Sequence, residues 1–296
     1  MNTARCVPDE FGYTRVLSGD VSESTQVRPT TGTAQAKERA VQAANELHSR
    51  TGADAFDAVV VLGSGWADAA DALGSVEAEL DMTELPGFVA PTAAGHYSTL
   101  RSILVGDKRA AVFCGRTHLY EKHDPMRIVH AVRTGVAAGA SVVVLTGAAG
   151  SLRTDFSVGQ PIVVRDHINL TSTSPLSGPD FVDLTEAYSP RLRTAAQEVD
   201  PSLAEGVYAS LLGPQFQTPA ELSMLRVAGA DLVGRSFALE TIAAVEMGAE
   251  VLGLSVVSND AMSAVFEPFD SLKALDVVRQ RAQHLGRLLS ATLQRS

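Results

Sequence analysis

The chain has 296 residues, of which 45% are hydrophobic and 20% charged, and its 34 acidic and 24 basic side chains give a formal net charge of -10 at pH 7. This composition is typical of a globular protein, and an acidic chain without a basic run is a poor candidate for binding nucleic acid or an anionic membrane. The two cysteines, Cys6 and Cys114, are too few for a disulfide framework or an all-cysteine zinc site. We therefore expect a cytoplasmic protein with no nucleic-acid, membrane or metal partner.

Residues 1–33 are polar, show no period and lack the apolar core of a signal peptide, which predicts an N-terminal tail. Residues 34–296 are expected to form a single domain, because no repeat or low-complexity linker interrupts them. The predicted elements are, in chain order, a helix over 34–50, a strand over 57–62, a hairpin of strands over 98–105 and 109–114, a helix over 125–139, strands over 141–146, 161–165 and 207–212, a helix from about 218, a helix over 238–248, a strand over 251–257 and a helix over 270–293.

The apolar strands show no polar alternation and are separated by helices, apart from the one hairpin. This pattern predicts an α/β fold with a mixed, largely parallel central sheet covered by helices on both faces. Ligands of such folds bind outside the carboxyl ends of the strands. We therefore expect one cleft formed by the segments that follow predicted strands, namely 63–65, 115–121, 147–152, 213–218 and 258–260.

Two of these segments are suited to an anion. Gly63-Ser64-Gly65 lets backbone N–H groups approach an anion and adds a hydroxyl donor, although a tight turn without ligand is an equal alternative. The segment Gly115–Glu121 contains Arg116, which can grip an oxyanion with a planar fork, and His118, which can donate a second bond. In an extended conformation Arg116, His118 and Tyr120 share one face, and the alternative is a solvated loop.

Three further segments have both a functional and a structural interpretation. The small residues of 146–150 let a ligand lie on the main chain or simply allow close helix–sheet packing. Ser236 half-matches a nucleophile elbow, with Ala238 in place of the last glycine, so a serine hydrolase is a weak alternative. Asn259 can donate and accept, which suits a heterocycle, or it caps the following helix.

Taken together and in order, these segments resemble the trimeric type of purine nucleoside phosphorylase from about Val59 to Ala274. The resemblance is based on the motifs VLGSGW at 61–66, GHYSTL at 95–100, GRTHLYE at 115–121, TGAAGSL at 146–152, RDHINL at 165–170 and GPQFQTPAE at 213–221. It implies the fold of that family, a homotrimer, and phosphate-dependent cleavage of a purine (deoxy)ribonucleoside to free base and (deoxy)ribose 1-phosphate. Phosphate is then a co-substrate, and no cofactor is expected.

The resemblance also implies roles for individual residues. The expected catalytic residues are His118, Asn259 and Glu121. Phosphate is expected at Ser64, His96, Arg116, Thr117, His118, the backbone of Ala148, and Ser236. The sugar is expected at Tyr120, Arg235 and Ser271, and the base at Phe216, Gln217, Asn259 and Asp260.

Several of these positions depart from the family pattern. The family usually has Glu where this chain has Gln217, Met in place of Arg235, and a His where our alignment places Ser271. Asp260 follows the base-binding Asn259. Many members place a Phe from the neighbouring subunit over the sugar, but the corresponding residues 171–174 contain no aromatic. A phosphorylase for inosine or guanosine is the leading hypothesis. The alternatives are specificity for 6-amino or 5′-modified nucleosides, or a catalytically weak protein that binds nucleoside or phosphate.

Overall fold

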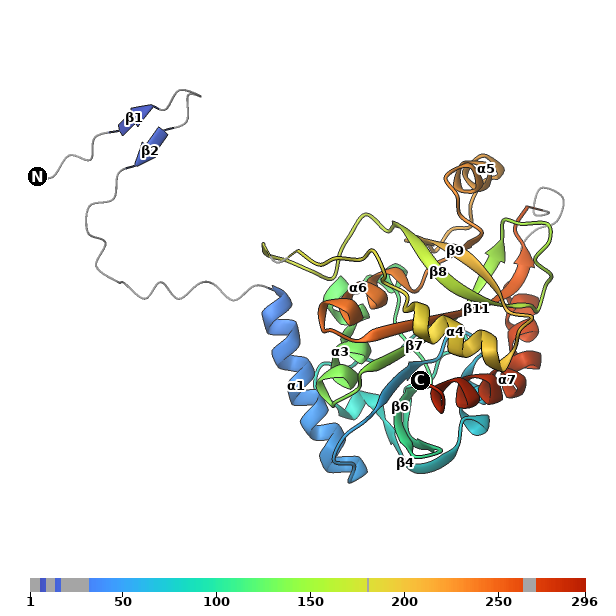
Figure 1. Cartoon of the computed structure of the whole chain (residues 1–296), viewed down its shortest axis with the longest axis horizontal. Helices are drawn as coiled ribbons and strands as arrows, with labels where there is room; N and C mark the ends of the chain where they lie inside the picture. Colours follow the sequence, from blue (N-terminus) through green and yellow to red (C-terminus); the bar gives the residue numbers. More distant parts are fainter. Residues whose placement is uncertain (1–5, 9–13, 17–31, 180, 263–269) are drawn as a thin grey trace, which may run out of the picture. The chain divides into compact units, whose positions relative to one another are not determined.

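The computed structural model describes residues 6–8, 14–16, 32–179, 181–262 and 270–296 (Figure 1). The chain divides into two compact units, Met1–Thr30 and Thr31–Ser296. In the first unit β1 (Cys6–Pro8) pairs antiparallel with β2 (Thr14–Val16), a pairing that we did not predict within the polar tail. The domain boundary at residue 33 remains a prediction.

The second unit is built on a sheet of nine strands in the order β10-β9-β8-β11-β7-β3-β6-β5-β4. The strands are β3 (Ala58–Val61), β4 (Ser75–Asp81), β5 (Thr99–Val105), β6 (Lys108–Phe113), β7 (Val142–Ser151), β8 (Pro161–Leu170), β9 (Ala204–Leu211), β10 (Leu232–Gly234) and β11 (Glu250–Asp260). The central strands β6, β3, β7 and β11 are parallel to one another, whereas the pairs β4–β5, β5–β6 and β8–β11 are antiparallel. The prediction of a mixed sheet with a parallel centre is therefore confirmed.

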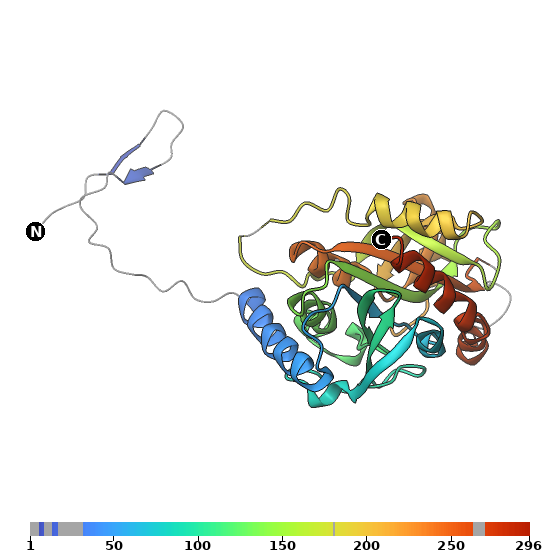
Figure 2. The same cartoon turned by 60° about the horizontal axis from the view of Figure 1, so that its bottom comes forward.

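Helices cover both faces of this sheet. They are α1 (Gly32–Thr51), α2 (Pro125–Ile128), α3 (His130–Ala137), α4 (Pro190–Val199), α5 (Pro219–Val227), α6 (Ala238–Glu246) and α7 (Ser271–Leu293). Alternate side chains of β3 divide between two cores: Val59 packs in the cluster that contains residues of α1, α3 and α6, whereas Val60 packs in the cluster of α4 and α7. Figure 2 shows the same two layers on either side of the strands.

The sheet also closes on itself, which the sequence pattern did not predict. The three-residue strand β10 pairs parallel with β9 and antiparallel with β7, where Leu232 faces Ser151 and Val233 faces Gly150. The strands β7, β11, β8, β9 and β10 thereby form a small barrel. A run of three residues carries no measurable period, so such a strand is invisible to pattern analysis.

Other boundaries also differ from the prediction. The segments 147–151 and 258–260 were expected to be loops, but they continue β7 and β11, because the small residues of β7 stay paired with β11 as far as Ser151. The helix expected over 125–139 is broken at Val129 into α2 and α3. The strand β4 was missed because its residues are mostly exposed and include Glu77, Glu79 and Asp81. The helix α4 was missed because it carries few apolar residues. None of the helices in the described ranges is long and apolar enough to cross a membrane.

Candidate active site

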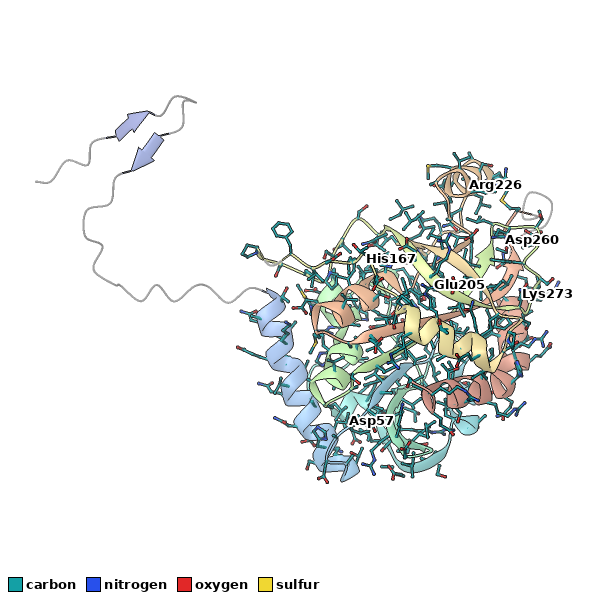
Figure 3. The ribbon with its side chains drawn as sticks, viewed as in Figure 1. Asp57, His167, Glu205, Arg226, Asp260 and Lys273 are labelled. Atoms are coloured by element: carbon teal, nitrogen blue, oxygen red, sulfur yellow. The ribbon has the colours of Figure 1, made fainter. Side chains whose placement is uncertain are left out.

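A cavity of about 290 Å³ lies among the carboxyl ends of the parallel strands. Figure 3 shows Asp57, which precedes β3, towards the bottom of the second unit, and Asp260 and Lys273, from β11 and α7, at its right edge. The predicted site residues on the wall of the cavity are Ser64, His118, Tyr120, Ala148, Phe216, Gln217, Arg235, Ser236, Asn259 and Ser271. His96, Arg116, Thr117, Glu121 and Asp260 do not line it. Segments that are far apart in the sequence therefore converge on one cavity, as expected.

Ser64 and His96 form a hydrogen-bonded pair at this cavity. The turn at Ser64 is tight, because Gly65 has φ +79° and a Cβ on Gly63 would lie 2.8 Å from the carbonyl oxygen of Thr146. His96 Nδ1 accepts the backbone N–H of Arg116 at 3.1 Å, and its Nε2 lies 2.8 Å from Ser64 Oγ. Burial lowers the pKa of His96 well below its usual value, so the ring is neutral and its one proton sits on Nε2. Nε2–H therefore donates to Ser64, whose own proton remains available to a ligand.

His118 is the second imidazole of the site, and its orientation is fixed by Glu121. His118 Nδ1 lies 3.2 Å from Glu121 Oε1, which also accepts the backbone N–H of His118 at 2.7 Å. Burial alone would raise the pKa of Glu121, but hydrogen bonds from His118 and Thr92 outweigh it and lower the pKa to about 2. Burial also lowers the pKa of His118, which is therefore neutral with its proton on Nδ1. Tyr120 stacks on this ring at 4.8 Å.

Arg116 lies behind the cavity wall rather than on it. Its Nη2 donates to the carbonyl oxygens of Val61 at 2.7 Å and Thr146 at 2.6 Å, and its Nη1 donates to Glu240 at 3.1 Å. The side chains of Arg116 and Glu240 are only 2% and 4% exposed. Arg116 and Thr117 line a much smaller hollow of about 10 Å³, which shares His118, Arg235 and Ser236 with the main cavity. Both Nη groups of the guanidinium are thus engaged by protein acceptors, whereas the buried Nε has no partner among the described residues.

Ser236 follows β10 at a constrained turn. The next residue, Phe237, has φ +73°, which is rare for a residue with a side chain, and its buried ring packs edge-on against Tyr208 at 4.6 Å. A Cβ on Gly147 would lie 2.7 Å from the Phe237 ring, so only glycine fits opposite it. Ser210 Oγ donates to the Ser236 carbonyl oxygen at 2.6 Å. These contacts hold Ser236 beside the small residues of β7.

Arg235 and the loop before α5 form another wall of the cavity. The Arg235 guanidinium lies 4.4 Å from the centroid of the Phe216 ring, and its Nη2 donates to the carbonyl oxygen of Gln215 at 2.6 Å. Within the part of the chain that the structure describes, no carboxylate lies in ion-pair distance of Arg235. Burial lowers the pKa of this guanidinium, which is the physical sign of a poorly solvated cation. The Phe216 side chain is 50% exposed at the rim.

The remaining predicted residues lie around the ends of β11 and α7. Asn259 is in β11, with Oδ1 2.9 Å from Ser258 Oγ, so it is not the cap of a described helix. Asp260 accepts the backbone N–H of Met262 at 2.9 Å. Ser271 is the first residue of α7, and the cap of that helix is Asp270. The sequence analysis did not single out Leu222, Val233 and Leu275 as wall residues, because apolar residues of helices and strands give no signal that separates wall from core.

A serine hydrolase finds little support in this geometry. In the described residues no histidine is hydrogen-bonded to the Ser236 hydroxyl, as a serine hydrolase would require. No group of three His, Cys, Asp or Glu side chains that could hold a metal ion occurs among the described residues. The Cys114 thiol is 4% exposed, and burial raises its pKa to about 11.

Comparison with known proteins gives a consistent result. A family model described as the phosphorylase superfamily matches residues 57–294. The purine nucleoside phosphorylase of Mycobacterium tuberculosis is 53% identical over 258 residues, which cover 87% of this chain and 96% of that protein. Isoform 2 of purine nucleoside phosphorylase from Schistosoma mansoni, solved with cytosine and ribose-1-phosphate, has a TM-score of 0.79 and 26% identity, with coverage of 86% of this chain and 95% of its own. A Schistosoma mansoni purine nucleoside phosphorylase in complex with adenosine has a TM-score of 0.78 and 26% identity, covering 87% and 96%.

Proposed function

Since the chain belongs to the phosphorylase superfamily, and is an enzyme of the purine nucleoside phosphorylase class, we propose how its cavity carries out that reaction. Enzymes of this class are pentosyltransferases: phosphate cleaves the N-glycosidic bond of a purine nucleoside and releases free base and a pentose 1-phosphate. As C1′ separates from the base it gains oxocarbenium character. The enzyme therefore has to hold an anionic nucleophile on one side of C1′ and stabilise the leaving base on the other.

The phosphate is held by Ser64, His118, the backbone of Ala148, and Ser236. The proposal is supported by the available Ser64 proton and by the shared wall formed by these residues. Arg116 and Thr117 act from behind, because the Arg116 fork is engaged by two carbonyl oxygens and Glu240. His96 acts through Ser64 and Glu121 through His118. Preoriented neutral groups of this kind need no reorganisation as charge develops.

The nucleoside occupies the rest of the cavity. Phe216 offers a half-exposed aromatic face for the purine, and Gln217 and Asn259 offer amide donors and acceptors for its edge. An amide donor from Asn259 to purine N7 stabilises the negative charge that arrives on the leaving base. Tyr120, Arg235 and Ser271 surround the sugar, and Asp260 contributes to the base edge from beyond the wall.

The preferred base is a 6-oxopurine, as in inosine or guanosine. The second candidate is a 6-amino or 5′-modified nucleoside. It is favoured by the Gln217 amide, which can donate to the unprotonated N1 of adenine, and by the Schistosoma mansoni relative that was solved with adenosine. A third candidate, a binding protein with weak turnover, is favoured by the Arg235 cation beside the sugar.

The observation that carries the proposal is that Ser64, His118 and Ser236 share one cavity with Phe216 and Asn259. The test is a panel of inosine, guanosine and adenosine with their 2′-deoxy and 5′-deoxy forms, incubated with and without phosphate, with free base measured by chromatography. Cleavage of 6-oxopurine nucleosides only in the presence of phosphate is expected. Cleavage confined to adenosine or 5′-deoxy forms would favour the second candidate. Tight binding by calorimetry without product would favour the third.

We also propose that the protein acts as a homotrimer in the cytoplasm. The rim of the cavity includes Phe216 and Leu272, which are 50% and 70% exposed, and a neighbouring copy would remove such apolar surface from water. The buried free thiol of Cys114 suits a reducing compartment. Light scattering coupled to size-exclusion chromatography tests the trimer, and a monomer with full activity would refute it.

A further inference from the structure

The carboxylate of Glu121 joins two segments beside the cavity. Its Oε1 accepts from the backbone N–H and Nδ1 of His118 at 2.7 and 3.2 Å. Its Oε2 accepts from the backbone N–H of Thr92 at 2.7 Å and from Thr92 Oγ1 at 2.5 Å. The Glu121 side chain is 4% exposed, so the carboxylate is shielded from water, whereas Thr92 lies on the exposed side of this contact. Hydrogen bonds to an ionised carboxylate are about twice as strong as neutral ones.

The segment that contains Thr92 also carries part of the site. Ala94 lines the cavity, and His96 lies four residues after Thr92 and donates to Ser64. A second tie between the segments lies at Gly115, where a Cβ would meet the backbone of Tyr97 at 2.5 Å, so only glycine permits this approach. The close approach at Gly115 fixes Tyr97, the residue after His96. The hydrogen bonds to Glu121 fix Thr92, four residues before His96. His96 is thus held from both sides.

We propose that Thr92 is a positioning residue for phosphate, acting through Glu121 on His118 and along its own segment on His96. This inference rests on the proposed phosphorylase reaction. Its chemical consequence concerns the two imidazoles, which have opposite tautomers. His96 donates a hydrogen bond from Nε2–H to Ser64, whereas His118 donates one from Nδ1–H to Glu121 and keeps a lone pair on Nε2 for the cavity.

The bound phosphate species follows from this polarity. A lone pair on His118 Nε2 repels a bare phosphate oxygen but accepts from a P–OH group. Ser64, in contrast, donates to an unprotonated oxygen. The site therefore selects a phosphate that still carries a proton and places that proton at His118. If His118 became protonated, it would lose this acceptor.

The test compares Thr92→Val, which removes the hydroxyl donor and keeps the backbone N–H, with Thr92→Ser, which keeps both. The matched control is Thr185→Val, since Thr185 makes the same paired bonds to Asp183 through its N–H at 2.9 Å and Oγ1 at 2.6 Å, away from the cavity wall. For Thr92→Val we expect kcat/KM for phosphate to fall about tenfold or more. KM for the nucleoside should change less than twofold, and Thr92→Ser and Thr185→Val should match wild type.

The pH profile separates positioning from mere loss of structure. Without the Thr92 hydroxyl, the Glu121 charge acts more fully on His118 and raises its pKa. The acidic limb of kcat/KM for phosphate should therefore move to higher pH in Thr92→Val and not in Thr185→Val. In a Glu121→Gln background, Thr92→Val should add little, because both changes break one network.

Calorimetry with inorganic phosphate gives a readout that does not depend on turnover. Weaker phosphate binding by Thr92→Val that is restored in Thr92→Ser supports the role of Thr92, whether or not a nucleoside is cleaved. If phosphate binding behaves in this way but no nucleoside is cleaved, the proposed reaction is wrong and the role of Thr92 stands. Unchanged phosphate binding and an unchanged acidic limb in a folded Thr92→Val would overturn the assignment of Thr92. Circular dichroism melting establishes that each variant is folded.

Discussion

The buried pair of Arg116 and Glu240 makes a sharp prediction about stability. Removing the carboxylate leaves a guanidinium that is 2% exposed without its counter-charge. Breaking a buried ion pair from one side costs about 3–5 kcal/mol. Arg116 keeps its two bonds to the carbonyl oxygens of Val61 and Thr146, and Gln can still accept from Nη1. We therefore expect Glu240→Gln to lower the free energy of unfolding by about 2–3 kcal/mol, and Glu240→Ala by about 4 kcal/mol.

The assay is equilibrium unfolding in urea, in phosphate-free buffer and again with phosphate. The control is Asp155→Asn, which breaks the exposed pair of Arg153 and Asp155, whose side chains are 41% and 63% exposed. Solvent screens such a pair, so the free energy of unfolding should stay close to that of wild type. Phosphate should stabilise Glu240→Gln more than wild type, because the released Arg116 charge is then free to meet an anion. A loss below about 1 kcal/mol in Glu240→Ala would refute the assignment of Glu240 as the counter-charge.

Three further predictions follow from the walls of the cavity. Gly147→Ala should destabilise by about 2–3 kcal/mol in thermal or urea unfolding, because its Cβ would lie 2.7 Å from the Phe237 ring; an unchanged melting temperature would contradict this contact. Arg235→Met should raise kcat/KM for a neutral nucleoside about tenfold by removing a cation beside the developing oxocarbenium ion, whereas Arg226→Met on α5 should not; a fall in kcat/KM would show that the charge assists the reaction. The pKa of His96 lies well below 6.5 in the folded state, so the unfolded chain takes up a proton first and the free energy of unfolding should fall as pH drops below 6.5. His96→Asn should lose less free energy of unfolding between about pH 7 and 5 than wild type. Equal losses in the two proteins would exclude His96 as the source.

The sequence pattern was sufficient where a signal is local. The buried strand before Ser64 and the start of α5 near Thr218 and Pro219 each depend on residues within a few positions, and both elements lie where expected. Local periodicity also predicted helices on both faces, apart from α4. The convergence of Ser64, His118 and Asn259 on one cavity followed from the rule that strand carboxyl ends meet at one edge.

The contacts that the pattern could not predict are those between distant segments. The fork of Arg116 was expected to meet an oxyanion, but its acceptors include Thr146 and Glu240, which are 30 and 124 residues away. The bond from His96 to Ser64 spans 32 residues. No spacing rule connects such pairs, so residue types predicted which groups gather at the site but not which of them bond to one another.

The closure of β10 on β7 has a consequence for how the molecule behaves in a crowded solution. An open sheet presents two unpaired edges, each a template for another chain. In the second unit, among the strands that the structure describes, the barrel removes one of these edges and leaves β4 at the other end. That edge carries Glu77, Glu79 and Asp81, and its residues are largely exposed. Glu77 and Glu79 are paired with Arg109 of β6 and Arg101 of β5, and charged, exposed side chains along an edge strand disfavour pairing with another chain. The chain therefore resists edge-to-edge aggregation.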